Sequence, residues 1–136
     1  MKQVACGDSH SMIVTQDGLV YAFGNNSGKQ LGLKNCQNDV KVPTLIEDLI
    51  LSNPAKVTSV ACANSFSIAV TNQGEVYSWG TNLYGALGLS KNLTSVETPT
   101  LLPKIQQVRK VSARHNHSIF LTQSGEVFMA GKGDCG

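Results

Sequence analysis

One stretch of the chain recurs three times, and this internal repeat is the strongest constraint on the fold. The copies span residues 4–24, 60–80 and 111–131 of the 136 residues. The first two copies continue alike, with a Gly-x-Asn triplet followed by Leu-Gly-Leu, at 24–26 and 31–33 and again at 80–82 and 87–89. A period of about 50 residues is typical of repeat units that bury a shared core between neighbours. We therefore divide the chain into a first repeat (1–56), a second (57–107) and a partial third (108–136).

Each unit has the pattern of short β-strands. In the second unit, β-branched and aromatic residues predict strands at Val57–Cys62, Phe66–Thr71 and 75–79. A fourth strand is expected after the prolines, around 44–47 and 100–102, and residues 49–54 are expected to form a loop insertion. Tight hairpins with a glycine at positive φ are expected at Gly18, Gly74 and Gly125. The sequence thus predicts an all-β fold, a partial β-propeller of four-stranded antiparallel blades.

The composition excludes several classes of function. The formal net charge is +2, which is too small to indicate a nucleic-acid binder. No apolar run reaches the roughly 18 residues of a membrane helix, so we expect no membrane insertion. The four cysteines, at 6, 36, 62 and 135, form no C-x-x-C pair, so neither a zinc site nor a redox motif is indicated. We expect an intracellular protein, cytoplasmic or nuclear, without a cofactor.

Two sets of reactive side chains recur with the repeat, and this favours structural roles for them. His10 and His117 share one repeat position, and Phe66 replaces them in the second unit. A local hydrogen bond that fixes the blade corner is therefore expected, rather than acid–base chemistry. Cys6 and Cys62 share another position, where the third unit has alanine, and this indicates a small buried site.

Two further motifs fall short of a functional site. The Gly-rich segment 24–30 has one residue too few for a phosphate-binding loop and carries Gln30 where Ser or Thr would hold magnesium. His115 and His117 would point to one side of a strand, but two ligands alone do not make a metal site. No catalytic residue is assigned, and we predict that the chain is not an enzyme.

The recurring pattern resembles the regulator of chromosome condensation repeat. It reads V-x-[AS]-C-x-x-x-H-S-x-x-[VL]-T-x-x-G-x-V-[YF]-x-[WF]-G-x-N-x-x-G-x-L-G-L and begins at Val4, Val60 and Val111. Phe66, Ala130 and Arg114 depart from it. The resemblance implies a propeller of seven blades, of which this chain carries about two and a half. A blade cannot bury both its faces alone, so we expect further blades, from the same or another chain, to close the ring.

Charge differs between the copies on this otherwise constant scaffold. The third copy is the basic one, through Lys104, Arg109, Lys110, Arg114 and His115. The tripeptides 7–9, 63–65 and 114–116 each follow one strand, so they should line one rim, from acidic through neutral to basic. Variable positions on a fixed scaffold are where a propeller can encode recognition. We predict that a protein partner binds Asp8, Asn64, Arg114, His115 and Lys110; the alternative is a solvated surface with scattered charge.

The most economical function is a protein–protein interaction scaffold that forms part of a larger regulatory protein. The resemblance also implies an alternative, because the founding member of the family is a guanine-nucleotide exchange factor for the small GTPase Ran. Exchange would act by differential binding of GTPase states and needs no covalent chemistry. Fold similarity alone does not transfer this activity.

Overall fold

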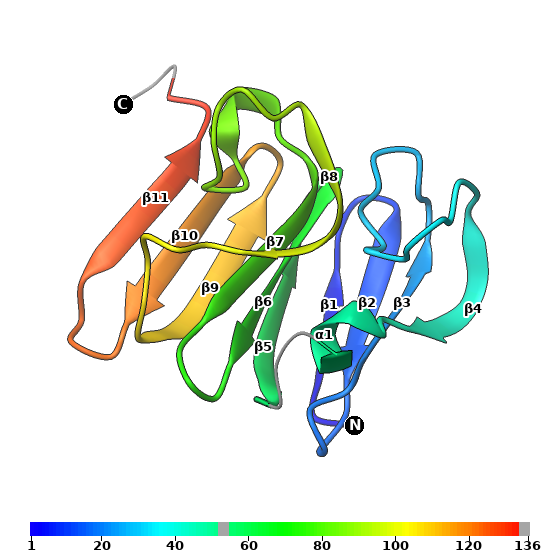
Figure 1. The fold of residues 1–136 in the computed structure, drawn as a ribbon, viewed down its shortest axis with the longest axis horizontal. Coiled ribbons are helices and arrows are strands. Elements are labelled where there is room, and N and C mark those ends of the chain that lie inside the picture. The colour runs from blue at the N-terminus through cyan, green and yellow to red at the C-terminus, as the bar shows by residue number, and fades with distance from the viewer. Residues whose placement is uncertain (52–54, 134–136) are drawn as a thin grey trace.

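The structure is a computed structural model that describes residues 1–51 and 55–133. It contains three antiparallel sheets that stand side by side like blades (Figure 1). The first sheet consists of β1 (Gln3–Cys6), β2 (His10–Val14), β3 (Val20–Gly24) and β4 (Val40–Leu45). The second consists of β5 (Val57–Cys62), β6 (Phe66–Thr71), β7 (Val76–Thr81) and β8 (Ser95–Leu101). The third, within the described residues, consists of β9 (Val108–Arg114), β10 (His117–Thr122) and β11 (Val127–Gly131).

The strands of each sheet follow one another in space as they do along the chain. The orders are β1-β2-β3-β4, β5-β6-β7-β8 and β9-β10-β11. The first strand of each sheet is the innermost, because β5 contacts both β1 and β9. The all-β expectation is confirmed, and the first two sheets are the predicted four-stranded antiparallel blades. The sheets of the described residues do not form a closed ring (Figure 1).

The fourth strand differs from the prediction. β4 and β8 begin before their prolines, and Pro43 and Pro99 lie inside them. Proline has no N–H to donate, but it is tolerated in an edge strand, where one row of backbone groups faces away from the sheet. The pairing with β3 and β7 also shifts register there, between Ala22 and Gly24 and between Ser78 and Gly80. The predicted start at 44 and 100 was therefore several residues too late.

The connections agree better with the sequence. Gly18, Gly74 and Gly125 have φ of 83°, 80° and 90°, which confirms the predicted hairpin glycines. The insertion predicted at 49–54 is in part helical, because the short helix α1 covers Asp48–Leu51; positions 52–54 lie outside the described residues. A single 3-10 turn, η1 (Leu83–Gly85), lies in the Gly-rich loop of the second sheet.

The hydrophobic core lies between the sheets rather than within any one of them. Met12 and Val14 of β2 belong to a first cluster with Val60 and Trp79 of the second sheet. A second cluster joins the second sheet to the third and includes Phe66, Ile68, Val111 and Phe120. Each sheet therefore depends on its neighbour for burial, as expected of a repeat array. None of the helices among the described residues is long and apolar enough to cross a membrane.

Candidate functional site: the loop rim

The loops that follow the inner strands lie at one rim, and the same backbone contact fastens each of them. Three equivalent N–H···O bonds of 2.8, 2.8 and 3.1 Å hold them: Asn25 to Ser9, Thr81 to Ser65, and Lys132 to Asn116. The residue before each donor is a glycine with φ between 106° and 124°. A Cβ on Gly24, Gly80 or Gly131 would lie 2.6, 2.5 or 2.0 Å from the carbonyl oxygen of the rim loop. Glycine is thus required for the loop to approach the strand end so closely.

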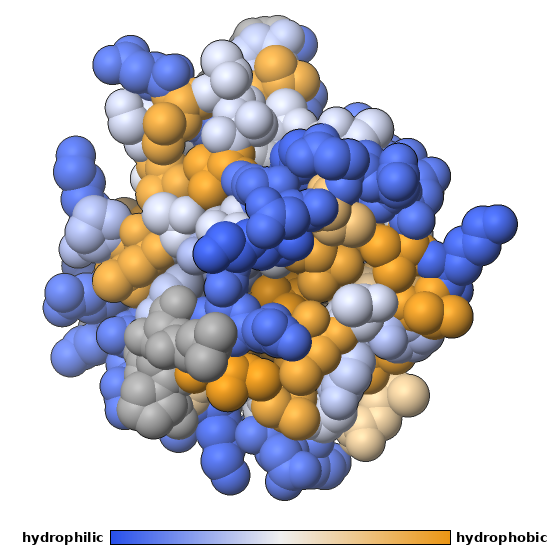
Figure 2. Space-filling view, turned by 45° about the vertical axis from the view of Figure 1, so that its right-hand side comes forward, coloured by the Kyte–Doolittle hydropathy of each residue, from blue (hydrophilic) through white to orange (hydrophobic). Residues whose placement is uncertain are grey.

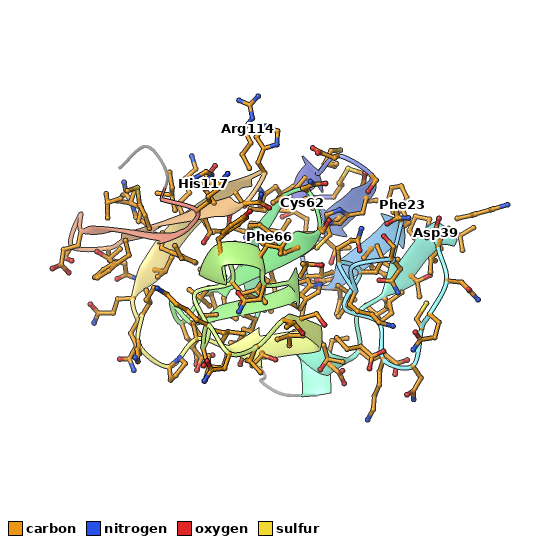
Figure 3. All side chains as sticks on the ribbon, turned by 90° about the horizontal axis from the view of Figure 1, so that it is seen from above. Phe23, Asp39, Cys62, Phe66, Arg114 and His117 are labelled. Carbon is orange, nitrogen blue, oxygen red and sulfur yellow. The ribbon has the colours of Figure 1, made fainter. Side chains whose placement is uncertain are left out.

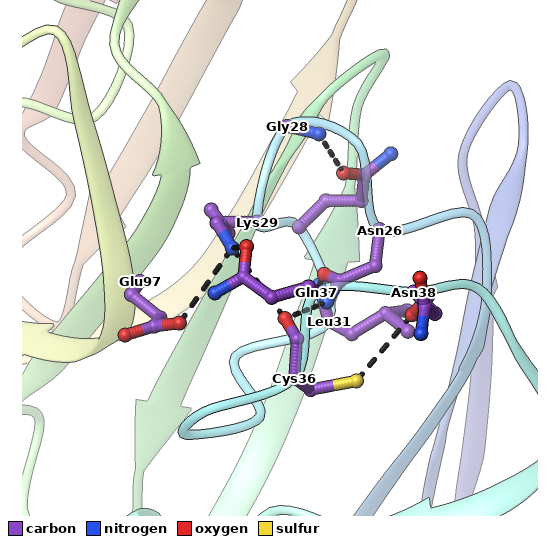
Figure 4. Close-up of polar contacts among 9 residues, drawn as sticks. Asn26, Gly28, Lys29, Leu31, Cys36, Gln37, Asn38 and Glu97 are labelled. Atoms are coloured by element: carbon purple, nitrogen blue, oxygen red, sulfur yellow. Dashed lines mark hydrogen bonds and ion pairs between the residues drawn. The ribbon is translucent and has the colours of Figure 1, made fainter.

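A buried asparagine holds the long Gly-rich loop of each complete sheet. The side chain of Asn26 accepts from the N–H of Leu31 at 3.2 Å and donates to the carbonyl of Cys36 at 2.9 Å (Figure 4). The equivalent Asn82 accepts from the N–H of Leu87 at 3.1 Å and donates to the carbonyls of Ser90 and Leu93. Each side-chain amide therefore supplies hydrogen bonds to backbone N–H and C=O groups of the loop, which have no neighbouring strand to pair with. The Gly-x-Asn triplet in the repeat was the sequence signal for this role.

One lysine of the first Gly-rich loop forms an ion pair with the second sheet. Lys29 donates to Gln37 Oε1 at 2.6 Å and forms an ion pair with Glu97 of β8 at 3.7 Å (Figure 4). Both side chains are partly exposed, so the pair contributes little to stability.

Serine side chains connect each sheet to the loop of the sheet before it. Ser67 Oγ donates to the carbonyl of Gln30 at 2.7 Å, and the equivalent Ser118 Oγ donates to the carbonyl of Ala86 at 2.7 Å. The indole N–H of Trp79 donates to the same Gln30 carbonyl at 2.9 Å. All three bonds are buried, and the serine bond is repeated between successive blades. The segment 24–30, which has some similarity to a phosphate-binding loop, is thus part of a structural contact between sheets. The carbonyl of Gln30 accepts hydrogen bonds from both Ser67 and Trp79.

His10 belongs to this contact, and its bond is not the local one that the sequence predicted. Its Nε2 lies 2.8 Å from Ser67 Oγ, in the next sheet. Because Ser67 donates its proton to the Gln30 carbonyl, the histidine must donate from Nε2, which leaves Nδ1 without a proton. Nδ1 is buried and has no hydrogen-bond partner among the described residues. Burial lowers the pKa of His10 from 6.5 to about 4, although the negative charge of Asp8 acts in the opposite direction.

The two equivalent cysteines differ in environment, which corrects the prediction of a shared buried site. Cys62 is buried against the first sheet, and burial, followed by the nearby Cys6, raises its pKa to about 12. Cys6 is exposed, because none of the sheets in the described part of the chain covers that face of β1. A thiol with so high a pKa stays protonated near neutral pH and is a poor nucleophile. Cys36 is partly exposed, and Cys135 lies outside the described residues.

Four of the five predicted partner-binding residues are exposed at this rim. Asp8 and Asn64 lie in the loops after β1 and β5, and Arg114 and His115 lie at the end of β9. Since β5 contacts β1 and β9, the acidic, neutral and basic positions follow one another across three blades. Arg114 projects away from the sheets (Figure 3).

Lys110 does not belong to the rim, although its side chain is exposed. It lies within β9, where it pairs with Leu121 of β10. At the rise of an extended strand, four residues separate it from Arg114 by about 13 Å. The sequence groups Lys110 with Arg114 and His115 because all three lie in one basic stretch, and charge alone does not distinguish a position within a strand from one in a loop.

The rim also exposes two apolar residues that the sequence did not single out. Leu83 and Tyr84 of η1 are 54% and 56% exposed, and Tyr84 has a φ of 58°. Lys132 lies over the Tyr84 ring at 5.3 Å from its centroid, and a hollow of about 300 Å³ beside them is lined by Lys91 and Gly133 among others. A positive φ in a residue other than glycine is uncommon and gives no sequence signal. The hollow thus has the aromatic ring of Tyr84 and the positive charges of Lys91 and Lys132 in its lining.

A second hollow lies on the outer side of the first sheet. It has a volume of about 470 Å³ and is lined by Leu33, Val40 and Leu45, with Lys34, Glu47 and Asp48 also contributing. Figure 2, in which the β4 side of the molecule is turned forward, shows apolar residues gathered between hydrophilic ones. The described residues contain no group of three or more His, Cys, Asp or Glu side chains that could hold a metal ion, and His115 and His117 find no further ligand there.

Two family descriptions match this chain, and both describe the same repeat. The chain matches the regulator of chromosome condensation (RCC1) repeat over residues 17–70 and 73–121, and a second description of the same repeat over 1–30 and 57–86. It is 34% identical over 130 residues to the X-linked retinitis pigmentosa GTPase regulator of Canis lupus familiaris, covering 94% of this chain and 13% of that protein.

Crystal structures with a similar fold include two from this comparison. Human WBSCR16 has a TM-score of 0.85 with 31% identity, over 96% of this chain and 33% of that one. Prp20p from Saccharomyces cerevisiae has a TM-score of 0.80 with 26% identity, over 97% and 32% of the two chains. The chain therefore spans about a third of the length of these two chains and 13% of the curated relative.

Proposed function

Because the chain belongs to the regulator of chromosome condensation repeat family, we propose that it is a protein–protein interaction scaffold that binds its partner with the loop rim. The observation that carries the proposal is the combination of a constant anchor and a variable side chain. Each rim loop is fastened by the same N–H···O bond, while the exposed residue at one repeat position changes from Asp8 through Asn64 to His115, with Arg114 next to it. Loops that share an anchor but present different outward side chains suit recognition.

The charges and the apolar rim residues indicate the kind of partner. A protein surface with basic groups opposite Asp8 and acidic groups opposite Arg114 and His115 would complement the rim. Leu83 and Tyr84 supply an exposed apolar surface, and tyrosine is enriched in protein interfaces. The role is non-covalent, and an intracellular location goes with it, since Cys6, Cys36 and Cys62 are all free thiols. Lys110 remains a candidate contact only for a partner that reaches down along β9.

The test is charge reversal on the rim. Immobilised native chain and an Arg114→Glu variant are compared for the proteins that they retain from a cell extract. We expect Arg114→Glu to weaken retention of a specific partner about tenfold. Lys104→Glu is the matched control, because it makes the same charge change in the exposed connection between β8 and β9, at the opposite rim. Equal retention by all three proteins would contradict the role of the rim.

A second candidate is guanine-nucleotide exchange on a small GTPase. It is supported by the similarity to a protein named as a GTPase regulator, and by Prp20p, whose structure is described with its binding properties to Gsp1p and histones. The test is release of fluorescent GDP from a Ran-type GTPase at micromolar chain. Accelerated release that Arg114→Glu abolishes would support exchange through the rim. A rate equal to spontaneous release would exclude this candidate and leave the scaffold proposal standing.

A further inference from the structure

The outer hollow, which lies beside β4 on the first sheet, is a feature that the loop rim does not explain. Its volume of about 470 Å³ falls within the range of pockets that hold ligands. Three segments of the first unit line it: the end of the Gly-rich loop with Leu33 and Cys36, β4 with Val40 and Leu45, and the residues at the start of α1. None of its described lining residues belongs to the rim, so the hollow is separate from the proposed function.

This hollow lies on the side of the first sheet that faces the second sheet. Leu33 and Val40 pack against the core cluster that these two sheets share. Asp48 lines the hollow from α1, and α1 contacts β8 of the second sheet. Both sheets that meet on this side are therefore present, yet Leu33, Val40 and Leu45 are only half-buried. The packing of the two sheets leaves this apolar wall open, and Figure 2 shows apolar surface on this side of the molecule.

The apolar wall recurs in the second unit, whereas the acidic residues beside it do not. The three wall residues have identical counterparts there: Leu89, Val96 and Leu101. Glu47 and Asp48, in contrast, correspond to Pro103 and Lys104. Two negative charges thus belong to the first hollow alone. A side chain that changes between copies of one scaffold is a candidate for specific recognition.

The charges around the outer hollow are divided between its two sides. Glu47 and Asp48 lie on the α1 side, and the ion pair found among the described residues, between Lys29 and Glu97, involves neither of them. Lys34 is exposed on the side of the Gly-rich loop. Carboxylates beside an apolar wall complement a ligand that carries a cation next to an apolar group.

We propose that the outer hollow binds a peptide segment of a partner protein in which a large apolar side chain stands next to an arginine or lysine. The apolar side chain fills the space between Leu33, Val40 and Leu45, which removes apolar surface from water. The basic side chain lies against Glu47 and Asp48. A second basic group on the opposite side would be repelled by Lys34, which favours one direction of the peptide.

The surface beside the hollow favours a peptide over a compact small molecule. Val42 of β4 is 66% exposed and Ile50 of α1 is 42% exposed, so the two elements that bound the hollow carry further apolar side chains. An apolar surface that is longer than the hollow suits a segment of several residues. One anchored side chain with neighbouring contacts that exclude water is also the usual arrangement of a binding hot spot.

A thiol in the lining gives a direct readout of occupancy. Cys36 is partly exposed, so a bound peptide should shield it from iodoacetamide. The full chain is treated with a pool of capped pentapeptides that carry one leucine or phenylalanine next to an arginine, and alkylation of Cys36 is followed by mass spectrometry. A second pool carries glutamate in place of the arginine. Cys6, which is exposed on β1, reports in the same sample on any general slowing of the reagent.

Three variants test the two halves of the site. Glu47→Lys reverses one charge at an exposed position, and Thr44→Tyr fills the hollow with a side chain that suits a strand. Glu126→Lys is the matched control, because it makes the same charge change in the exposed hairpin between β10 and β11 of the third sheet. Far-UV circular dichroism checks each fold, and alkylation rates with and without peptide are compared within each variant.

We expect the arginine pool at about 1 mM to slow alkylation of Cys36 about fivefold, in the native chain and in Glu126→Lys, and to leave Cys6 unchanged. Glu47→Lys should weaken this protection about tenfold in apparent affinity, and Thr44→Tyr should abolish it. If Thr44→Tyr does not fold, the exposed Glu47→Lys still decides the question. Equal protection by the two pools, no protection of native Cys36, or full protection in Glu47→Lys would overturn the proposal.

Discussion

A single buried imidazole links pH to the contact between the first two sheets. His10 is 3% exposed, its Nε2–H is bound to Ser67, and its Nδ1 accepts nothing. Protonation would place a buried charge with no acceptor beside it, which explains the fall of its pKa to about 4. The unfolded chain, by contrast, binds a proton near the ordinary value of 6.5. The contribution of neutral His10 to the free energy of unfolding is therefore fully present above pH 6.5 and is lost as the pH falls from there towards 4.

This linkage predicts that His10→Phe removes part of the acid sensitivity. Phenylalanine is the residue that the second repeat already carries at this position, as the buried Phe66. Between pH 7.5 and 5, His10 should cost the native chain about 2 kcal/mol of unfolding free energy, and His10→Phe should not lose this amount. Urea titrations at the two pH values measure the difference. His117→Phe, at the exposed equivalent position, should keep the native pH dependence; equal slopes in all three proteins would contradict the assignment.

At the scale of elements, the folded conformation of each Gly-rich loop depends on one buried asparagine side chain, Asn26 in the first sheet and Asn82 in the second. Asn82→Ala removes the acceptor of the Leu87 N–H and the donor to the Ser90 and Leu93 carbonyls. We expect a loss of about 2–3 kcal/mol and earlier cleavage within residues 82–94 by a protease, because buried backbone groups lose their partners. Limited proteolysis followed by mass spectrometry locates the cut. Asn92→Ala in the same loop is the control, since Asn92 is exposed and should leave the cleavage rate unchanged.

The elements show what a repeat can and cannot predict. The strands Val57–Cys62 and Phe66–Thr71 agree with the prediction residue for residue, because alternation and the hairpin glycines are local signals. β4 and β8 were placed too late, since a proline usually ends a strand and only the edge position, a tertiary property, makes it acceptable. The repeat also predicted the rim loops and the exposure of Asp8, Asn64 and Arg114, although their binding role stays a prediction.

The candidate site was harder to predict wherever a contact crosses from one sheet to the next. His10 and Ser67 are 57 residues apart, so a local interpretation assigned the histidine to its own blade. Cys6 and Cys62 occupy one repeat position, yet only the second has a sheet in front of it. Tyr84 is exposed and has a positive φ, neither of which its residue type suggests. Equivalent sequence positions thus have equivalent neighbours only when the adjacent blade is also present.

At the scale of the whole molecule, the three sheets form a row in which the first and third do not share a core. The first cluster joins the first two sheets, and the second cluster joins the last two. Stability in such an array is a sum of units and nearest-neighbour interfaces. Weakening one interface should therefore release one end of the row before the other. Trp79 is the single tryptophan, fully buried in the first cluster, so its fluorescence reports on one interface alone.

Phe120→Ala tests this separation. Phe120 is fully buried in the second cluster, and its truncation should cost about 3–5 kcal/mol at the interface between the second and third sheets. In urea, the far-UV circular dichroism of the variant should begin to change at lower denaturant than the fluorescence of Trp79. Met12→Ala, in the first cluster, should instead shift the Trp79 transition directly. If Phe120→Ala moves both signals together, the three sheets unfold as one cooperative unit, and the nearest-neighbour account fails for this chain.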